Sequence, residues 1–209
     1  MIDNQFSIPF HTYSIDDWET NKKKILDSLP DFKDYKLKKS KNSAHGDKNH
    51  YSDYFSNLNK PPKYSNVVLS ILEKHIKSFC EYTKENWNIN ALWFQSYERY
   101  NNFQVHNHGI GGWSAVLYVE FDDKEHSATT FYCPYMSNKR SFLGGYDTYI
   151  PKVKEGDLII FPAFIMHEAS SNMSDKRRTI ISFNLKWKIL SKYTTCLLYT
   201  SDAADDGLC

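Results

Sequence analysis

The chain has 209 residues, long enough for one domain with a substantial hydrophobic core. Its formal net charge is +1, from 26 basic and 25 acidic residues, which gives no indication of binding to nucleic acid or to a membrane surface. Aromatic residues make up 16% of the chain, a share that suits a β-rich protein with bulky core side chains.

Nothing in the sequence indicates export or membrane insertion. The longest apolar stretches, such as residues 157–166, are far shorter than a membrane span. Residues 1–10 lack the basic and apolar segments of a signal peptide. The four cysteines form no CxxC pattern, and reduced thiols are the default in a cytosol. We therefore expect a cytoplasmic protein.

Two amphipathic helices are predicted in the N-terminal half. Residues 14–28 form the first, because Ser14 can cap a helix whose first turn holds two acidic residues. The second, over residues 65–87, is clearer, since apolar residues recur at helical spacing after a capping serine. Residues 31–64 between them are polar, and we expect an irregular surface segment with a short strand near residues 51–55.

From residue 90 the hydrophobic period changes from helical spacing to two, which is typical of strands. Turn residues rich in Gly, Asn and Asp separate the apolar segments. The predicted strands are residues 91–100, 114–121, 128–135, 146–150, 157–162 and 178–187. Short strands after N-terminal helices predict a mainly β, α+β fold, in which a β-sandwich or barrel has the helices packed on one side.

The last fourteen residues break this pattern. Residues 196–209, CLLYTSDAADDGLC, neither extend the preceding strand nor form a plausible new element. They resemble a translated sequencing adapter appended to the reading frame, so we interpret them as non-native. The expected organisation is one domain over residues 1–195, with helical support in residues 1–90 and a β core in residues 91–188.

The stretch FQVHNHGIGGWSAVLYVEF, residues 103–121, places two histidines before a glycine-rich turn and an apolar strand. His167 follows another apolar strand about sixty residues later, and Arg178 comes eleven positions after it. Imidazole suits Fe(II), and a redox-active iron needs a few ligands on one face with open positions opposite. Inward side chains alternate along barrel strands, so these histidines can converge, while an arginine can hold the carboxylate of an acidic co-substrate. The glycines are expected to adopt positive φ in a tight turn, and Trp113 to line the site entrance.

These segments resemble a known family. SYERYNNFQVHNHGIGGWSAVLYVEF (residues 96–121) and EGDLIIFPAFIMHEASSNMSDKRRTIISFN (residues 155–184) are similar to the 2-oxoglutarate- and Fe(II)-dependent dioxygenases, above all to the prolyl-hydroxylase-like branch and its oxygenases from phages and marine bacteria. The resemblance implies a double-stranded β-helix, a jelly roll of two facing sheets. It also implies Fe(II), 2-oxoglutarate and O₂ as cofactor and co-substrates, and hydroxylation of a C–H bond as the reaction.

The resemblance assigns roles to individual residues. His106 and His167 match the two metal-binding histidines, and Arg178 matches the residue that binds the far carboxylate of 2-oxoglutarate. Strand phase favours Arg178 over its neighbour, because Arg178 shares a face with Ser182, a weaker candidate for the same pocket. Tyr97 stands nine residues before His106, where relatives place a tyrosine whose hydroxyl reaches that carboxylate.

One position departs from the family pattern. The usual second ligand is an Asp or Glu two residues after the first histidine, and His108 stands there instead. Our preferred hypothesis is a His106, His108 and His167 site, whose net charge is one unit more positive and whose iron retention is weaker. In the alternative, His108 points away and a water or substrate group takes its place.

Two other function classes stay open. GDLIIFPAFIMH, residues 156–167, also resembles a motif of cupin metalloenzymes, which do not use 2-oxoglutarate, although Arg178 favours the oxygenase. A β-sandwich binding module with a degenerate site would bind neither metal nor co-substrate. The partner expected for the enzyme is a small-molecule or peptidyl substrate, with no nucleic acid and no membrane; the sequence identifies neither the substrate nor the oligomeric state.

Overall fold

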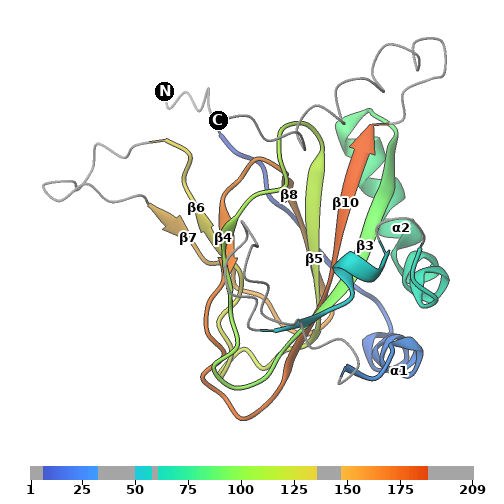
Figure 1. Cartoon of the computed structure of the whole chain (residues 1–209). Coiled ribbons are helices and arrows are strands. Elements are labelled where there is room, and N and C mark those ends of the chain that lie inside the picture. The colour runs from blue at the N-terminus through green and yellow to red at the C-terminus, as the bar shows by residue number, and fades with distance from the viewer. Residues whose placement is uncertain (1–6, 33–49, 58–60, 136–146, 188–209) are drawn as a thin grey trace, which may run out of the picture.

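The computed structural model describes residues 7–32, 50–57, 61–135 and 147–187, and its core is a pair of facing antiparallel sheets (Figure 1). The larger sheet has the order β1 (His11–Ser14), β8 (Asp157–Pro162), β5 (Trp113–Glu120), β10 (Arg178–Trp187), β3 (Trp87–Tyr97) and β2 (Tyr51–Ser52). The smaller sheet has the order β4 (Phe103–His106), β9 (His167–Ala169), β6 (Thr130–Tyr132) and β7 (Thr148–Tyr149). Two facing sheets of this kind confirm the predicted double-stranded β-helix.

Helices α1 (Trp18–Ser28) and α2 (Ser65–Thr83) cover the outer face of the larger sheet (Figure 1). The predicted start of the first helix at Ser14 was wrong. Residues 11–14 instead form an edge strand paired with β8, and the Ser14 hydroxyl donates to the Asp157 carboxylate at 2.7 Å. Long-range strand pairing therefore overrode the local capping signal.

The end of the second helix was also predicted too late. Lys84 closes α2 in the left-handed conformation, with φ 57°, and Trp87 already belongs to β3. The short strand near residue 51 is confirmed as β2, and a 3₁₀ turn, η2 (Tyr54–Asn57), follows it.

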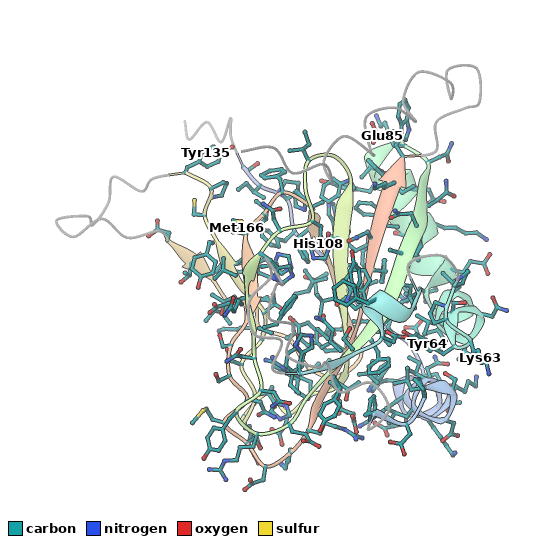
Figure 2. All side chains as sticks on the ribbon, viewed as in Figure 1. Lys63, Tyr64, Glu85, His108, Tyr135 and Met166 are labelled. Carbon is teal, nitrogen blue, oxygen red and sulfur yellow. The ribbon has the colours of Figure 1, made fainter. Side chains whose placement is uncertain are left out.

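The alternation of side chains along the strands of the larger sheet builds two separate hydrophobic cores. One face, with Leu117, Ile181 and Phe183, packs against Val68 and Leu72 of α2 in a layer between sheet and helices. The other face fills the space between the two sheets, where the side chains pack densely (Figure 2). The members of this inner core include Tyr97, Val116, Tyr118, Phe131, Phe161 and Ile180.

The strand phases decide which residues can reach the space between the sheets. Ile180 belongs to the inner core and Ile181 to the outer one, as the predicted phase of residues 178–187 requires. Trp113 lies on the outer face, edge-on to Phe79 and Trp87, so the expectation that it lines the site entrance was wrong.

Three strands were not predicted: β1, β4 and β9. Strand β4 contains a bulge, because Phe103 pairs with Ala169 and His106 with His167, so three steps on β4 span two steps on β9. The extra residue turns both Phe103 and His106 to the same face, where their rings lie 4.2 Å apart between centroids. The bulge therefore aims His106 at the inside of the β-helix.

The glycine turn after His108 has the predicted positive φ angles, with 83° at Gly109 and 89° at Gly112. At Gly112 only hydrogen fits, because a Cβ atom would lie 2.4 Å from the Leu185 carbonyl oxygen.

Cys80 and Cys133 are free thiols. Within the described ranges no helix has the length and apolar character needed to cross a membrane. The proposed adapter-derived tail, residues 196–209, lies outside the described residues.

Candidate active site

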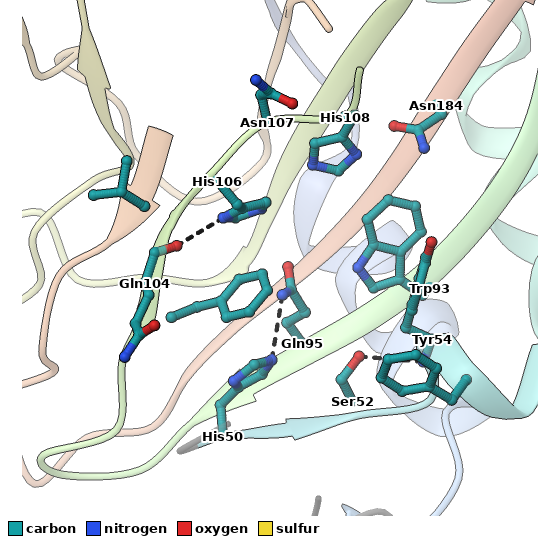
Figure 3. A pocket seen from close by; sticks show the side chains of 13 residues that line it. His50, Ser52, Tyr54, Trp93, Gln95, Gln104, His106, Asn107, His108 and Asn184 are labelled. Carbon is teal, nitrogen blue, oxygen red and sulfur yellow. Dashed lines mark hydrogen bonds between the residues drawn. The ribbon is translucent and has the colours of Figure 1, made fainter. Parts of the chain in front are cut away.

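The three histidines singled out in the sequence converge at one point. His106 ends β4, His167 begins β9, and the two face each other in the register of these strands. His108 follows two residues later and is held by its backbone N–H, which donates to the Ala163 carbonyl at 2.9 Å. One ring nitrogen from each of the three histidines lies within 4.8 Å of the other two. Three nitrogens this close together can share one metal ion, and His106 and His108 are seen side by side in Figure 3.

Two backbone carbonyls fix the ring orientation in this cluster. Nδ1 of His106 lies 2.8 Å from the Gln104 carbonyl oxygen, and Nδ1 of His167 lies 2.9 Å from the Ile165 carbonyl oxygen. Because a carbonyl only accepts, each Nδ1 carries the proton and the lone pair is on Nε2. A carbonyl behind the distal nitrogen is the usual outer-shell partner of a metal-binding histidine.

Two of the three histidines, His108 and His167, are neutral at pH 7. Burial lowers the pKa of His108 to about 4, with a further contribution from nearby His106. Burial also holds the pKa of His167 well below 6.5, reinforced by the two neighbouring histidines. Neutral imidazole is the form that binds a metal, so no proton has to be displaced before an ion binds these two side chains at pH 7.

No carboxylate joins the cluster among the residues that the structure describes. Glu120 is engaged by Arg177 and Thr179, and Asp122 by Lys176, so the two acidic groups nearest in sequence are held elsewhere. The available donor set is three imidazoles, which fits Fe(II) by ligand type and leaves the site without a negative protein ligand among the described residues.

Arg178 lies behind the cluster, in the layer between the sheets, and only 2% of it is exposed. Its Nη1 donates to the Ser127 carbonyl at 2.7 Å and its Nη2 to the Ser170 carbonyl at 3.3 Å. The guanidinium lies 4.4 Å from the centroid of the Tyr97 ring, and its Nε has no hydrogen-bond partner. No carboxylate in the described ranges forms an ion pair with it, so the guanidinium is a buried cation without a counter-anion.

Tyr97 is the second orphaned group. Its side chain is fully buried, its hydroxyl has no partner, and burial raises the pKa of the phenol. Tyr97 and the three histidines border an inner cavity of about 20 Å³, and Ser182 borders it too while donating to Gln95 Oε1 at 3.0 Å. The Tyr97 hydroxyl, on a cavity that reaches the histidines, and the Arg178 guanidinium over the Tyr97 ring are two unsatisfied donors that fit the carboxylate of a diacid. The cavity holds about one water, so lining side chains have to move when such a ligand enters.

A larger pocket of about 380 Å³ opens on the outer side of the histidines (Figure 3). It brings in residues that the sequence analysis did not assign to the site, including His50, Trp93, Gln95 and Asn184. Trp93 and Gln95 share the strand phase of Tyr97, so the alternation rule applied to β3 could have identified them. His50 comes from a distant segment with no periodic signal, and its ring stacks on Tyr97 at 5.0 Å between centroids.

Comparisons with known proteins agree with this geometry. Residues 91–184 match the model of a family described as "Putative 2OG-Fe(II) oxygenase". This range contains all six residues assigned to the site from the sequence. No curated protein matches the chain.

Several solved structures share the fold. The α-ketoglutarate-dependent epimerase SnoN from nogalamycin biosynthesis is 12% identical with a TM-score of 0.61, over 90% of this chain and 83% of SnoN. A Pseudomonas putida prolyl-4-hydroxylase is 10% identical with a TM-score of 0.55, over 87% of this chain and 94% of that one. The viral collagen prolyl hydroxylase of Paramecium bursaria Chlorella virus-1 is 12% identical with a TM-score of 0.54, over 84% of this chain and 94% of that one.

The two kinds of comparison carry different weight. At these identities the structural likeness establishes the shared fold, and the family model supplies the link to enzymes that use Fe(II), 2-oxoglutarate and O₂. Through residues 91–184, this chain is similar to the 2OG-Fe(II) oxygenase family.

Proposed function

We propose that this oxygenase holds Fe(II) through His106, His108 and His167 and binds 2-oxoglutarate through Arg178 and Tyr97. The observation that carries the proposal is the cluster of three ring nitrogens within 4.8 Å of one another. Tyr97 borders the same inner cavity as these histidines, and the Arg178 guanidinium, buried and without a counter-anion in the described ranges, lies over the Tyr97 ring. When bound, iron supplies the oxidation chemistry: one atom of O₂ becomes a hydroxyl on a substrate carbon, and the other enters succinate as 2-oxoglutarate loses CO₂.

The chain's own residues would orient the reactants. The carbonyls of Gln104 and Ile165 hold two imidazoles with Nε2 toward the common point. In the proposal, the far carboxylate of 2-oxoglutarate accepts hydrogen bonds from Arg178 Nε and the Tyr97 hydroxyl, which removes two buried unsatisfied donors at once. The substrate is a small molecule or a peptidyl group that enters through the outer pocket.

We also propose that residues 1–195 act as one catalytic domain. Side chains of α1 and α2 form a common core with the larger sheet, and the far side of that sheet lines the candidate site. Removal of the helices would expose this core, so the β-helix needs them for folding.

Anaerobic titration with Fe(II), followed by 2-oxoglutarate, tests the metal and co-substrate sites in turn. The proposal expects stoichiometric iron uptake and then a weak visible charge-transfer band. His106→Ala and His167→Ala should abolish uptake, whereas His75→Gln, a control at a buried histidine of α2, should retain it. Iron uptake with no band would indicate a cupin-like metal site without 2-oxoglutarate, and an absence of uptake would leave only a binding module.

A further inference from the structure

The outer pocket carries information about the substrate. Its volume of about 380 Å³ falls in the range of sites that hold small organic ligands. One wall continues the metal cluster through His106 and His108, so a ligand in the pocket would lie next to the proposed iron (Figure 3). The pocket is therefore where the group to be oxidised would enter, an argument that rests on the proposed function.

The lining has no acidic side chain, lysine or arginine among its 13 described residues. Transferring a carboxylate, phosphate or ammonium group from water into such a site, without a partner of opposite charge, is unfavourable by several kcal/mol. The part of a ligand that packs in this pocket without touching the iron is therefore expected to be neutral.

Aromatic rings form one continuous wall. The Trp93 indole stacks on the His108 ring, with 5.6 Å between centroids and an interplanar angle of 20°. Tyr54 meets Trp93 edge-on at 5.0 Å, and Phe55 meets Tyr54 at 5.2 Å. Tyr54 and Phe55 remain 38% and 49% exposed at the rim, so a flat ligand could cover apolar surface that water now contacts.

Two carboxamides on this lining are held by hydrogen bonds. Gln95 is 6% exposed; its Oε1 accepts from Ser182, and its Nε2 lies 3.3 Å from His50 Nε2. An amide nitrogen has two N–H donors, so one donor of Gln95 remains for a ligand. Asn184 is engaged more fully, since its Oδ1 accepts from Ser114 at 2.9 Å and its side chain also hydrogen-bonds His108. The remaining Gln95 donor, held in a fixed position on this wall, selects a ligand with a carbonyl-type acceptor.

We propose that the prime substrate is a small uncharged planar ring compound that carries a carbonyl or carboxamide oxygen. The ring packs against the wall of Trp93 and Tyr54, and the oxygen accepts from Gln95. The pocket thereby disfavours free amino acids, whose ammonium group would have no partner of opposite charge inside it.

A matched set of fragments tests this proposal on the metal-free protein. Benzamide, benzoate and benzamidine share one ring and differ in charge, and ligand-observed NMR titration gives the affinity of each. Binding is assigned to this pocket only where Trp93→Ala or Gln95→Met weakens it relative to the wild-type chain. Gln95→Met keeps the shape of Gln95 and deletes its donors. Benzamide should bind about tenfold more tightly than either charged fragment. Trp187→Ala, at a tryptophan that is 61% exposed, serves as the control and should change nothing.

The proposal is overturned if benzoate or benzamidine binds this pocket as tightly as benzamide, if benzamide binding survives both pocket variants, or if benzamide does not bind. Gln95→Met decides the question should Trp93→Ala fail to fold. Cyclohexanecarboxamide adds a test of planarity, since a non-planar ring should bind more weakly than benzamide. Because the titration needs neither iron nor 2-oxoglutarate, its failure is distinguishable from failure of the metal and co-substrate sites.

Discussion

Replacement of Arg178 by glutamine tests the co-substrate site most directly. In the structure two guanidinium nitrogens are already used by the Ser127 and Ser170 carbonyls, so Nε and the positive charge are what remain for a ligand. A hydrogen bond to a charged group contributes about 1.5–3 kcal/mol. Its loss should raise the dissociation constant of 2-oxoglutarate about 10- to 150-fold.

Anaerobic calorimetry with the Fe(II)-loaded protein measures this constant. Arg177→Gln is the matched control, because Arg177 is the preceding residue, is more exposed, and pairs with Glu120 outside the site. Thermal unfolding of both variants shows whether Arg178→Gln is folded, since its two carbonyl partners lose their donors. The reasoning is refuted if folded Arg178→Gln binds 2-oxoglutarate like the wild-type chain, or if Arg177→Gln weakens binding equally.

Three further predictions concern the metal cluster and the turn beside it. His108→Asp supplies the negative ligand that the cluster lacks and should raise the affinity for Fe(II) about tenfold or more. Competition with a chelator measures this affinity. A lower affinity in the variant would show that the third imidazole is the better ligand. Gly112→Ala should lower the unfolding free energy by about 1–3 kcal/mol, measured by denaturant titration, because its Cβ would meet the Leu185 carbonyl oxygen at 2.4 Å. Gly111→Ala, with φ +85° but no atom within 4 Å of the added carbon, separates backbone strain from this clash and should be milder. The metal-free protein should lose stability as pH falls below 6.5 toward 4, because His108 and His167 gain protons first in the unfolded state. The lowered pKa of His108 alone should reduce the unfolding free energy by about 2 kcal/mol between pH 7 and pH 5. Denaturation curves with equal midpoints at these two pH values would contradict the burial of a neutral His108.

The long strands of the β core could be predicted from the sequence. Residues 157–162 and 178–187 were placed with the correct ends, and the phase of the latter put Arg178 and Ser182 between the sheets. Such segments are long enough for the apolar alternation to be visible, and they are covered on both faces by other elements.

The strands that carry the histidines could not be predicted in the same way. Strand β4 has four residues and β9 has three, so neither shows a hydrophobic period, and both depend on pairing with distant strands. The histidines were identified through their spacing and family pattern. The wall of the outer pocket was missed because Trp93 and Gln95 were assigned no role, although they share a strand face with Tyr97.

The bulge in β4 gives the segment between Phe103 and His106 one residue more than the opposite segment of β9. Many side chains could replace Gln104 and Val105, because Gln104 holds the His106 ring through its main-chain oxygen and Val105 is 43% exposed. Removal of either residue would restore simple alternation, in which Phe103 and His106, now two steps apart, still share a face and still oppose Ala169 and His167. A one-residue deletion there should therefore retain iron uptake, as metal analysis of the purified variant would register, and substitutions at the same two positions should retain it too.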